Sequence, residues 1–452
     1  MIKPPLKQTY IDIRQESIRS ISYVLFLAGF SYYCILPIIF LSSFPDNVIA
    51  KIVLERFPER HMVMYWCLIA LYFISFSCGY YFSSKKGPTK AREKISNNIG
   101  KLSVLVTTCY VGIAISIVNV TEILSPLGYL DGYDIGHRGQ LTTFYLISIW
   151  WFIYLKSMKS TVYTNIQSKL MAAIAFIAGL NLLTLGSRLG VISGLISLFI
   201  FYGYFVKGKQ LQVRVVRKLG SLKWIAIIVM VAILMFSIGL LRTGEGISLE
   251  GIIGIFAAEP IFIYASVPNY FMHSSLPLFA IPFDLFTGIV GAIPSFLFPD
   301  KADLFLEYSA RNVDSYSGFG GVHHLVSLIA NFGLIGFPFV AFIEGTWFGM
   351  LVRRVNANAF YRAVALTSIS LLTFFMFREG LQAPIKLLFF NFLLFPFIVI
   401  RMLLLVKPLV TAKAAGKTNG TYGPKHSSDS FVVCPTGISD QTNGASLQHR
   451  GE

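Results

Sequence analysis

Long apolar blocks constrain the fold of this chain more than any other feature of its sequence. They run for about 17 to 25 residues, long enough for a helix to cross the hydrocarbon core of a membrane. The chain has 452 residues, of which 55% are hydrophobic and 13% charged, about half the charged share of a soluble domain. The sequence therefore predicts an all-α, polytopic integral membrane protein with about ten transmembrane helices. The expected spans are 21–42, 62–82, 102–120, 140–155, 170–186, 189–206, 224–241, 324–350, 361–377 and 381–406.

The charges between these spans predict the orientation. The loops assigned to the cytoplasm hold 22 Lys and Arg residues and three acids, whereas the outer loops hold nine Lys and Arg residues and fifteen acids. Cytoplasmic loops are enriched in Lys and Arg, and this also explains the net charge of +16 without a nucleic-acid partner. We therefore expect both termini in the cytoplasm.

Five regions follow from this topology. Residues 1–20 form a cytoplasmic tail, 21–241 the first seven spans, 242–323 a large outer loop, 324–406 the last three spans, and 407–452 a polar, disordered cytoplasmic tail. Two apolar runs inside the outer loop, 252–267 and 276–298, are short or interrupted by proline. We interpret them as interfacial or re-entrant helices, although a pair that crosses the membrane and returns would leave the later topology unchanged.

A glycine-rich loop leads into two adjacent histidines, His323 and His324, at the expected start of the eighth span. A neutral imidazole can accept a proton from a hydroxyl near physiological pH, so either histidine is a candidate base. Outer carboxylates such as Asp300, Asp303 and Glu307 are the rival bases, and Glu344 is expected to face the protein interior or lie near the cytoplasmic end.

Four arginines from separate segments are expected at the same outer level. Guanidinium groups bind phosphate oxygens in a bidentate manner and can stabilise a departing diphosphate. The four candidates are Arg188, Arg242, Arg311 and Arg378. In another polar outer loop, His137 and Arg138 are candidate glycan contacts. The five cysteines lack metal-ligand spacing, so we expect no structural disulfide and no zinc site. No cofactor is expected either.

The Gly186-Ser-Arg-Leu-Gly190 turn between two spans, the long outer loop and the helix from His324 to Gly336 resemble features of the bacterial O-antigen polymerases of the Wzy type. More distantly, they are similar to the O-antigen ligases. In the ligases a polar residue follows the histidine, whereas Leu325 follows His324 here, which favours a polymerase.

The resemblance implies a GT-C-like fold in the bacterial inner membrane and a metal-independent glycosyltransferase. It would join undecaprenyl-diphosphate-linked oligosaccharide repeat units at the periplasmic face. Its partners would be these substrates, membrane lipids and a chain-length regulator. Histidine would assist attack by an acceptor hydroxyl, and the arginines would stabilise the leaving diphosphate. The alternatives are a transporter or flippase for polysaccharide intermediates and an O-antigen ligase.

Overall fold

The computed structural model describes residues 6–45, 51, 53, 59–85, 138–158, 162–184, 188–206, 249–273, 276–292, 298–300, 321–382, 385–394 and 396–398. All of them belong to the first of two compact units, residues 1–403 and 404–452. The expected spans 102–120 and 224–241, residues 399–406 of the last expected span and the C-terminal tail lie outside these residues.

The described part of the chain is helical and contains no strand beyond one isolated bridge between Val322 and Glu379. The elements before the outer loop are α1 (Leu6–Phe30), η1 (Ser31–Ile35), α2 (Leu36–Ser43), α4 (Glu59–Ser84), α7 (Arg138–Ser157), α8 (Val162–Thr184), α9 (Arg188–Phe201) and η2 (Tyr202–Val206). They are followed by α12 (Leu249–Tyr264), α13 (Ser266–His273), α14 (Phe283–Ala292), α16 (His324–Arg354), α17 (Ala359–Glu379) and η4 (Ile385–Leu394).

Among the described residues, four segments are long and apolar enough to cross a membrane: Gln15–Ser43, His61–Ser84, His324–Arg354 and Ala359–Glu379. They match four of the ten expected spans. The expected spans 140–155, 170–186 and 189–206 fall on α7, α8 and α9 with η2. The helical class is therefore confirmed for the described residues, and the four apolar segments are consistent with a membrane protein. The number of spans stays a prediction.

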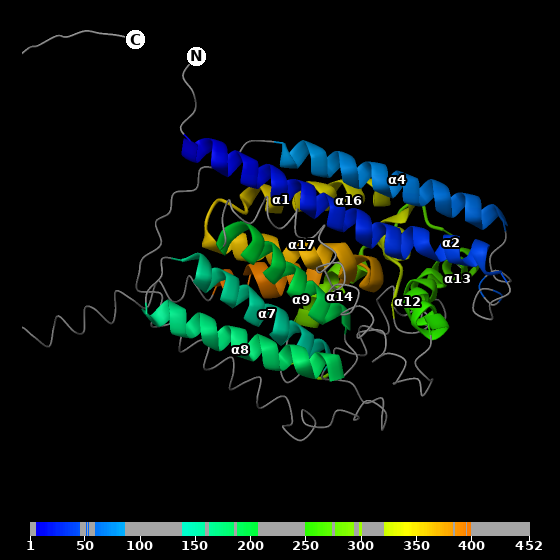
Figure 1. Cartoon of the computed structure of the whole chain (residues 1–452). Coiled ribbons are helices and arrows are strands. Elements are labelled where there is room, and N and C mark those ends of the chain that lie inside the picture. Colours follow the sequence, from blue (N-terminus) through cyan, green and yellow to red (C-terminus); the bar gives the residue numbers. More distant parts are fainter. Residues whose placement is uncertain are drawn as a thin grey trace, which may run out of the picture. The chain divides into compact units, whose positions relative to one another are not determined.

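Small residues allow α4 and α16 to lie in direct contact, as Figure 1 shows. A Cβ atom on Gly345 would overlap the backbone of Phe76, and one on Gly349 would overlap Ser83. Small residues are the usual means by which membrane helices approach closely. Because 345 lies beside 76 and 349 beside 83, these two helices run in the same direction.

Aromatic rings fill the space between α1, α4 and α17. The rings of Phe26 and Phe76 stack with centroids 3.8 Å apart, and Phe377 of α17 lies 5.8 Å from Phe26. All three side chains are buried. This packing fixes the end of α17 that carries Arg378.

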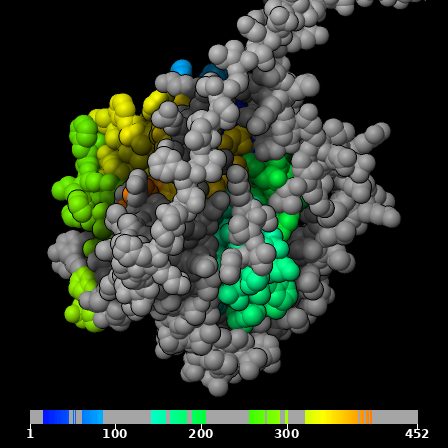
Figure 2. Space-filling view, turned by 90° about the vertical axis from the view of Figure 1, so that its left-hand side faces the viewer, coloured from blue at the N-terminus to red at the C-terminus, as the bar shows by residue number. Residues whose placement is uncertain are grey.

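The short helices of the outer loop cover the start of α16. In the space-filling view of Figure 2, the green residues of 249–292 lie beside the yellow residues that begin α16. Several large apolar side chains of this region are exposed, among them Leu278, Phe279, Ile281 and Phe286. Leu278, Phe279 and Ile281 lie in the non-helical segment before α14, and Phe286 lies on α14. Exposed apolar side chains next to a short helix are expected of an interfacial segment.

Candidate functional site

The helix α16 is broken at Gly333. Gly333 has φ 74° and ψ 176°, a conformation that is essentially restricted to glycine. The next backbone N–H groups, of Leu334 and Ile335, donate to the carbonyls of Pro277 and Leu278, at 2.9 Å and 3.2 Å. The helix therefore consists of a first arm, 324–332, and a second arm, 334–354, and the single span expected over 324–350 is interrupted.

The two arms fold back on each other. In a continuous helix, residues 324 and 344 would be roughly 30 Å apart along the axis. Here Nε2 of His324 lies 3.1 Å from Oε2 of Glu344. The second arm alone has 21 residues, about 32 Å of helix, which is enough to cross a membrane. Since Glu344 stands half-way along it, the imidazole of His324 lies well inside the bundle and not at its end.

His323 serves as the N-cap of the first arm. Its Nδ1 accepts from the backbone N–H of Leu325 at 3.2 Å, so the ring proton belongs on Nε2, which lies 3.3 Å from the hydroxyl of Tyr65. The side chain is 0% exposed. Burial, and next the neighbouring His324, lower the pKa of His323 to about 3, and a hydrogen bond to the backbone of Tyr33 opposes this shift. His323 is therefore neutral at physiological pH.

His324 has different surroundings from its neighbour. Glu344 accepts from its Nε2, and the hydroxyl of Tyr72 also donates to Oε2 of Glu344, at 3.4 Å. The other ring nitrogen, Nδ1, is buried, and no residue in the described part of the chain forms a hydrogen bond with it. His324 lines a cavity of about 10 Å³ together with Cys34, Tyr72 and Phe377, and its side chain is 1% exposed. The imidazole of His324 and the half-buried carboxylate of Glu344 thus form a polar contact between membrane helices.

Arg378 lies at the accessible part of the site. Its Nη1 is 3.4 Å from Oε1 of Glu259, and its Nε is 3.4 Å from Oε1 of Glu379. The side chains of Arg378, Glu259 and Glu379 are 34%, 41% and 20% exposed. The hydroxyl of Tyr33 donates to Oε1 of Glu259 at 3.1 Å. One guanidinium and two carboxylates, contributed by α12 and α17, therefore meet at a partly open surface.

Backbone contacts join this charged group to the histidines. The N–H of Val322 donates to the carbonyl of Arg378 at 3.1 Å, and Val322 pairs with Glu379 in the isolated bridge. Gly380, which ends α17, has φ 64°, so the chain turns sharply there. The residues just before His323 and the end of α17 are thus held side by side.

Two prolines set the positions of Tyr32 and Tyr33. Pro260 lies inside α12 and has no N–H, so it cannot donate to the carbonyl of Phe256 four residues earlier. The hydroxyl of Tyr32 donates to that carbonyl at 2.8 Å. Tyr32 and Tyr33 lie in the π-helical turn η1, which precedes Pro37 at the start of α2. π-helical turns are frequent at functional sites.

A buried polar network supports the first arm of α16 from its other side. Asp284, at the start of α14, accepts from Oγ of Ser327 at 3.0 Å and from Nδ2 of Asn331 at 2.8 Å. Oγ of Ser327 also accepts from the backbone N–H of Leu381, at 3.1 Å. These contacts tie the first arm to α14 and to the residue after the turn at Gly380.

Of the predicted site residues, the structure brings together His323, His324 and Arg378. Arg188 begins α9 and Arg138 begins α7, but their side chains lie outside the description, as do Arg242, Arg311 and His137. The sequence analysis missed Glu259 and the pairing of Glu344 with His324. An acidic residue within an apolar run, as in Ala258-Glu259-Pro260, is a usable signal because ionisable groups are rarely placed there without a function.

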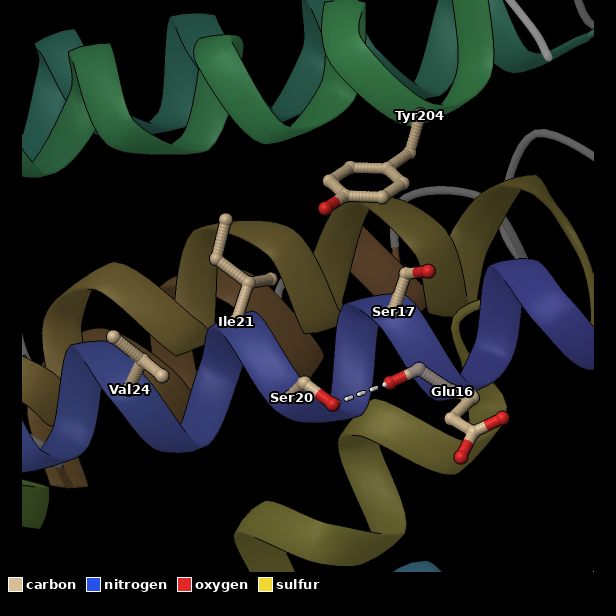
Figure 3. A pocket seen from close by; sticks show the side chains of 6 residues that line it. All are labelled: Glu16, Ser17, Ser20, Ile21, Val24 and Tyr204. Atoms are coloured by element: carbon tan, nitrogen blue, oxygen red, sulfur yellow. Dashed lines mark hydrogen bonds between the residues drawn. The ribbon is translucent and has the colours of Figure 1, made fainter. Parts of the chain in front are cut away.

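A groove elsewhere in the molecule is separate from this group of residues. It has a volume of about 520 Å³ and is lined by Glu16, Ser17, Ser20, Ile21, Val24 and Tyr204. Figure 3 shows Tyr204 reaching from η2 across to α1, where Oγ of Ser20 donates to the backbone carbonyl of Glu16. Its lining includes one carboxylate and no histidine or cation, so it does not match the predicted chemistry. No group of three His, Cys, Asp or Glu side chains suited to a metal ion occurs among the described residues.

No protein-family model, curated protein or solved structure matches this chain. The function is therefore argued from the chemistry of these side chains and from the resemblance noted in the sequence.

Proposed function

We propose that this protein is a glycosyltransferase that joins undecaprenyl-diphosphate-linked oligosaccharide repeat units at the periplasmic face of the bacterial inner membrane. The observation that carries the proposal is the group formed by Arg378, Glu259 and Glu379, which is partly exposed at the end of a membrane helix. A fixed guanidinium suits a diphosphate, and a carboxylate suits a sugar hydroxyl.

The distribution of charge supports the orientation. Arg353 and Arg354 end α16, and Lys85 follows α4. The side chain of Gln15 in α1 donates to the carbonyl of Val352 at 2.8 Å, so α1 begins at this same basic end. Basic helix ends belong on the cytoplasmic side. Because α17 runs away from this end, Arg378 would face the periplasm.

In the proposed reaction, Arg378 binds the diphosphate of the donor. The acceptor hydroxyl attacks the anomeric carbon, and the bond from that carbon to the diphosphate oxygen breaks. Negative charge then grows on the leaving diphosphate, where a preorganised cation gives its largest stabilisation. Arg188, Arg242 and Arg311 are proposed as further diphosphate contacts, and His137 and Arg138 as glycan contacts.

The test is complementation of a strain from which this gene is deleted, with surface polysaccharide displayed as a ladder on a gel. Wild type should restore long chains, and Arg378→Ala should leave single repeat units at an unchanged protein level. Arg378→Lys should restore few long chains, because an ammonium group lacks the bidentate geometry. Arg354→Ala, at the basic end, is the matched control and should behave as wild type. A full ladder with Arg378→Ala would refute the role of Arg378.

A second candidate function is a proton-coupled transporter or flippase for polysaccharide intermediates. It is favoured by the buried contacts of His324, Glu344 and Tyr72, since ionisable chains inside membrane helices often relay protons. Under this reading the deletion strain would export no polysaccharide at all, not even single units. Export would also depend on the transmembrane pH gradient.

A further inference from the structure

We propose that Glu259 is the general base that accepts the proton of the acceptor hydroxyl, in place of either histidine. This inference rests on the proposed glycosyl transfer and names the residue that carries its proton step.

The three candidate bases, Glu259, His323 and His324, differ in how far their side chains are exposed. The side chain of Glu259 is 41% exposed, whereas His323 and His324 are 0% and 1% exposed. A general base must come within hydrogen-bond distance of the proton it removes. The carboxylate of Glu259 is therefore open to contact from outside, whereas side chains packed around both imidazoles cover them.

The histidines are also committed to other contacts. Both ring nitrogens of His323 have partners, and its pKa of about 3 makes it a weak base. His324 uses Nε2 to hold Glu344 across the break in α16. These contacts explain two adjacent histidines in a membrane protein without assigning the proton transfer to them.

The carboxylate of Glu259 is held by one of its oxygens. Oε1 accepts from the hydroxyl of Tyr33 and faces Nη1 of Arg378. No hydrogen bond or ion pair within the described part of the chain uses Oε2, which is left for a substrate. Glu379, the other carboxylate beside Arg378, is half as exposed. Glu259 thus combines a fixed orientation with an open acceptor oxygen.

Neighbouring elements keep Glu259 in place before a substrate arrives. It lies next to Pro260, where α12 loses one internal hydrogen bond, and Tyr32 occupies the carbonyl that the proline leaves. The adjacent Tyr33 binds the carboxylate itself. Catalytic groups act best when their supporting contacts are fixed in advance.

The proposed step is balanced within this group. Oε2 of Glu259 takes the proton as the acceptor oxygen forms its bond to the anomeric carbon. The bond from that carbon to the diphosphate breaks, and its electron pair leaves with the diphosphate, beside Arg378. The protonated Glu259 then returns its proton to the periplasmic water.

The experiment compares full-length variants in the deletion strain and in detergent, with lipid-linked repeat units extracted from that strain as substrate. Glu259→Gln keeps the size of the side chain but removes its basicity, so turnover should fall about 100-fold or more. Glu379→Gln should lose much less, and Glu16→Gln, on an exposed position of α1, should match wild type. The turnover of His324→Gln, compared with wild type at equal protein level, tests whether His324 is the base instead of Glu259.

Rescue by a small carboxylate distinguishes a base from a structural partner. Turnover by Glu259→Ala should rise at least tenfold on addition of sodium formate, whereas Arg378→Ala should not respond. If Glu259→Gln retains turnover, or if formate fails to rescue Glu259→Ala, the assignment of the base is overturned while wild-type activity upholds the proposed function. If wild type itself makes no polymer from these substrates, the proposed function fails first.

Discussion

His323 and His324 are adjacent in the sequence but have separate physical roles. His323 caps a helix through Nδ1 and is neutral, whereas His324 reaches Glu344 on the other arm of α16. Adjacent residues on a helix point about 100° apart, so one can face α4 and the other the second arm. At the scale of single residues, the two histidines therefore hold the two arms of α16 in place beside the charged group at Arg378.

The low pKa of His323 makes stability depend on pH. Burial lowers this pKa from 6.5 to about 3, so below pH 6.5 the unfolded chain binds a proton that the folded protein does not. This stabilising contribution is complete above pH 6.5 and is lost as the pH falls towards 3. Between pH 6.5 and 5 the loss is about 2 kcal/mol. His323→Asn keeps an N-cap oxygen and should remove this part of the dependence, measured as thermal unfolding midpoints in detergent at pH 7 and pH 5.

Asn358 provides the control for this measurement. It caps α17 through its side-chain oxygen and has no titratable group, so Asn358→Ser should unfold with the same pH dependence as wild type. Equal pH dependence in wild type and His323→Asn would mean that His323 is not buried in its neutral form.

At the scale of elements, the break in α16 determines which side chains meet. The fold-back predicts energetic coupling between His324 and Glu344. Their separate replacements by Ala should each destabilise the protein by about 1–3 kcal/mol, because each leaves a buried polar partner unsatisfied. The double variant should cost clearly less than the sum, with a coupling of about 1 kcal/mol or more. Unfolding free energies of the four proteins in detergent provide this measurement.

A second cycle, between Glu344 and the exposed His273, should be additive to within about 0.5 kcal/mol. Additivity in the His324 cycle as well would indicate a continuous α16, in which the two side chains never meet.

The sequence predicts part of this arrangement. Apolar block length identifies the helices, and the sequence singles out His323, His324 and Arg378, which the structure places near one another. The break does not follow from periodicity, because Gly333 and Gly336 form a Gly-x-x-Gly step that also suits a continuous helix. The backbone angles of Gly333, and the hydrogen bonds to the carbonyls of Pro277 and Leu278, show that the helix breaks at Gly333. The contact between His324 and Glu344, and with it the depth of the histidines, therefore required the structure.

The role of Glu259 also could not be predicted from the sequence, because it depends on contacts between distant segments. It stands 119 residues before Arg378 in the sequence, and no local pattern joins them. Their contact is supported by Tyr33 from a third segment, which donates a hydrogen bond to Glu259. Where a site is assembled from several helices, composition can identify the charged candidates, but packing decides which of them share an ion pair.

At the scale of the whole molecule, a purely basic cluster and the mixed group of Arg378, Glu259 and Glu379 lie at the ends of different described helices. Arg353, Arg354 and Lys85 lie where α16 and α4 end, and the Arg378 group lies where α17 ends. The helix α4 and the second arm of α16 run in parallel, so their basic C-terminal ends lie at the same end of the bundle. The first residues of α4 therefore lie at the opposite end. The ring of His61 there contacts Phe271 of α13, which places α13 at that end too.

This polarity predicts the sidedness of labelling. In a variant without native cysteines, His273→Cys should react with a membrane-impermeant maleimide in intact spheroplasts. Ala357→Cys and Lys85→Cys, which report independently on the basic end, should react only after lysis, since basic helix ends face the cytoplasm. Reversed labelling at all three positions would put Arg378 and Glu259 on the cytoplasmic side and exclude periplasmic polymerisation. Labelling of Ala357→Cys and Lys85→Cys from opposite sides would contradict the parallel packing of α4 with α16.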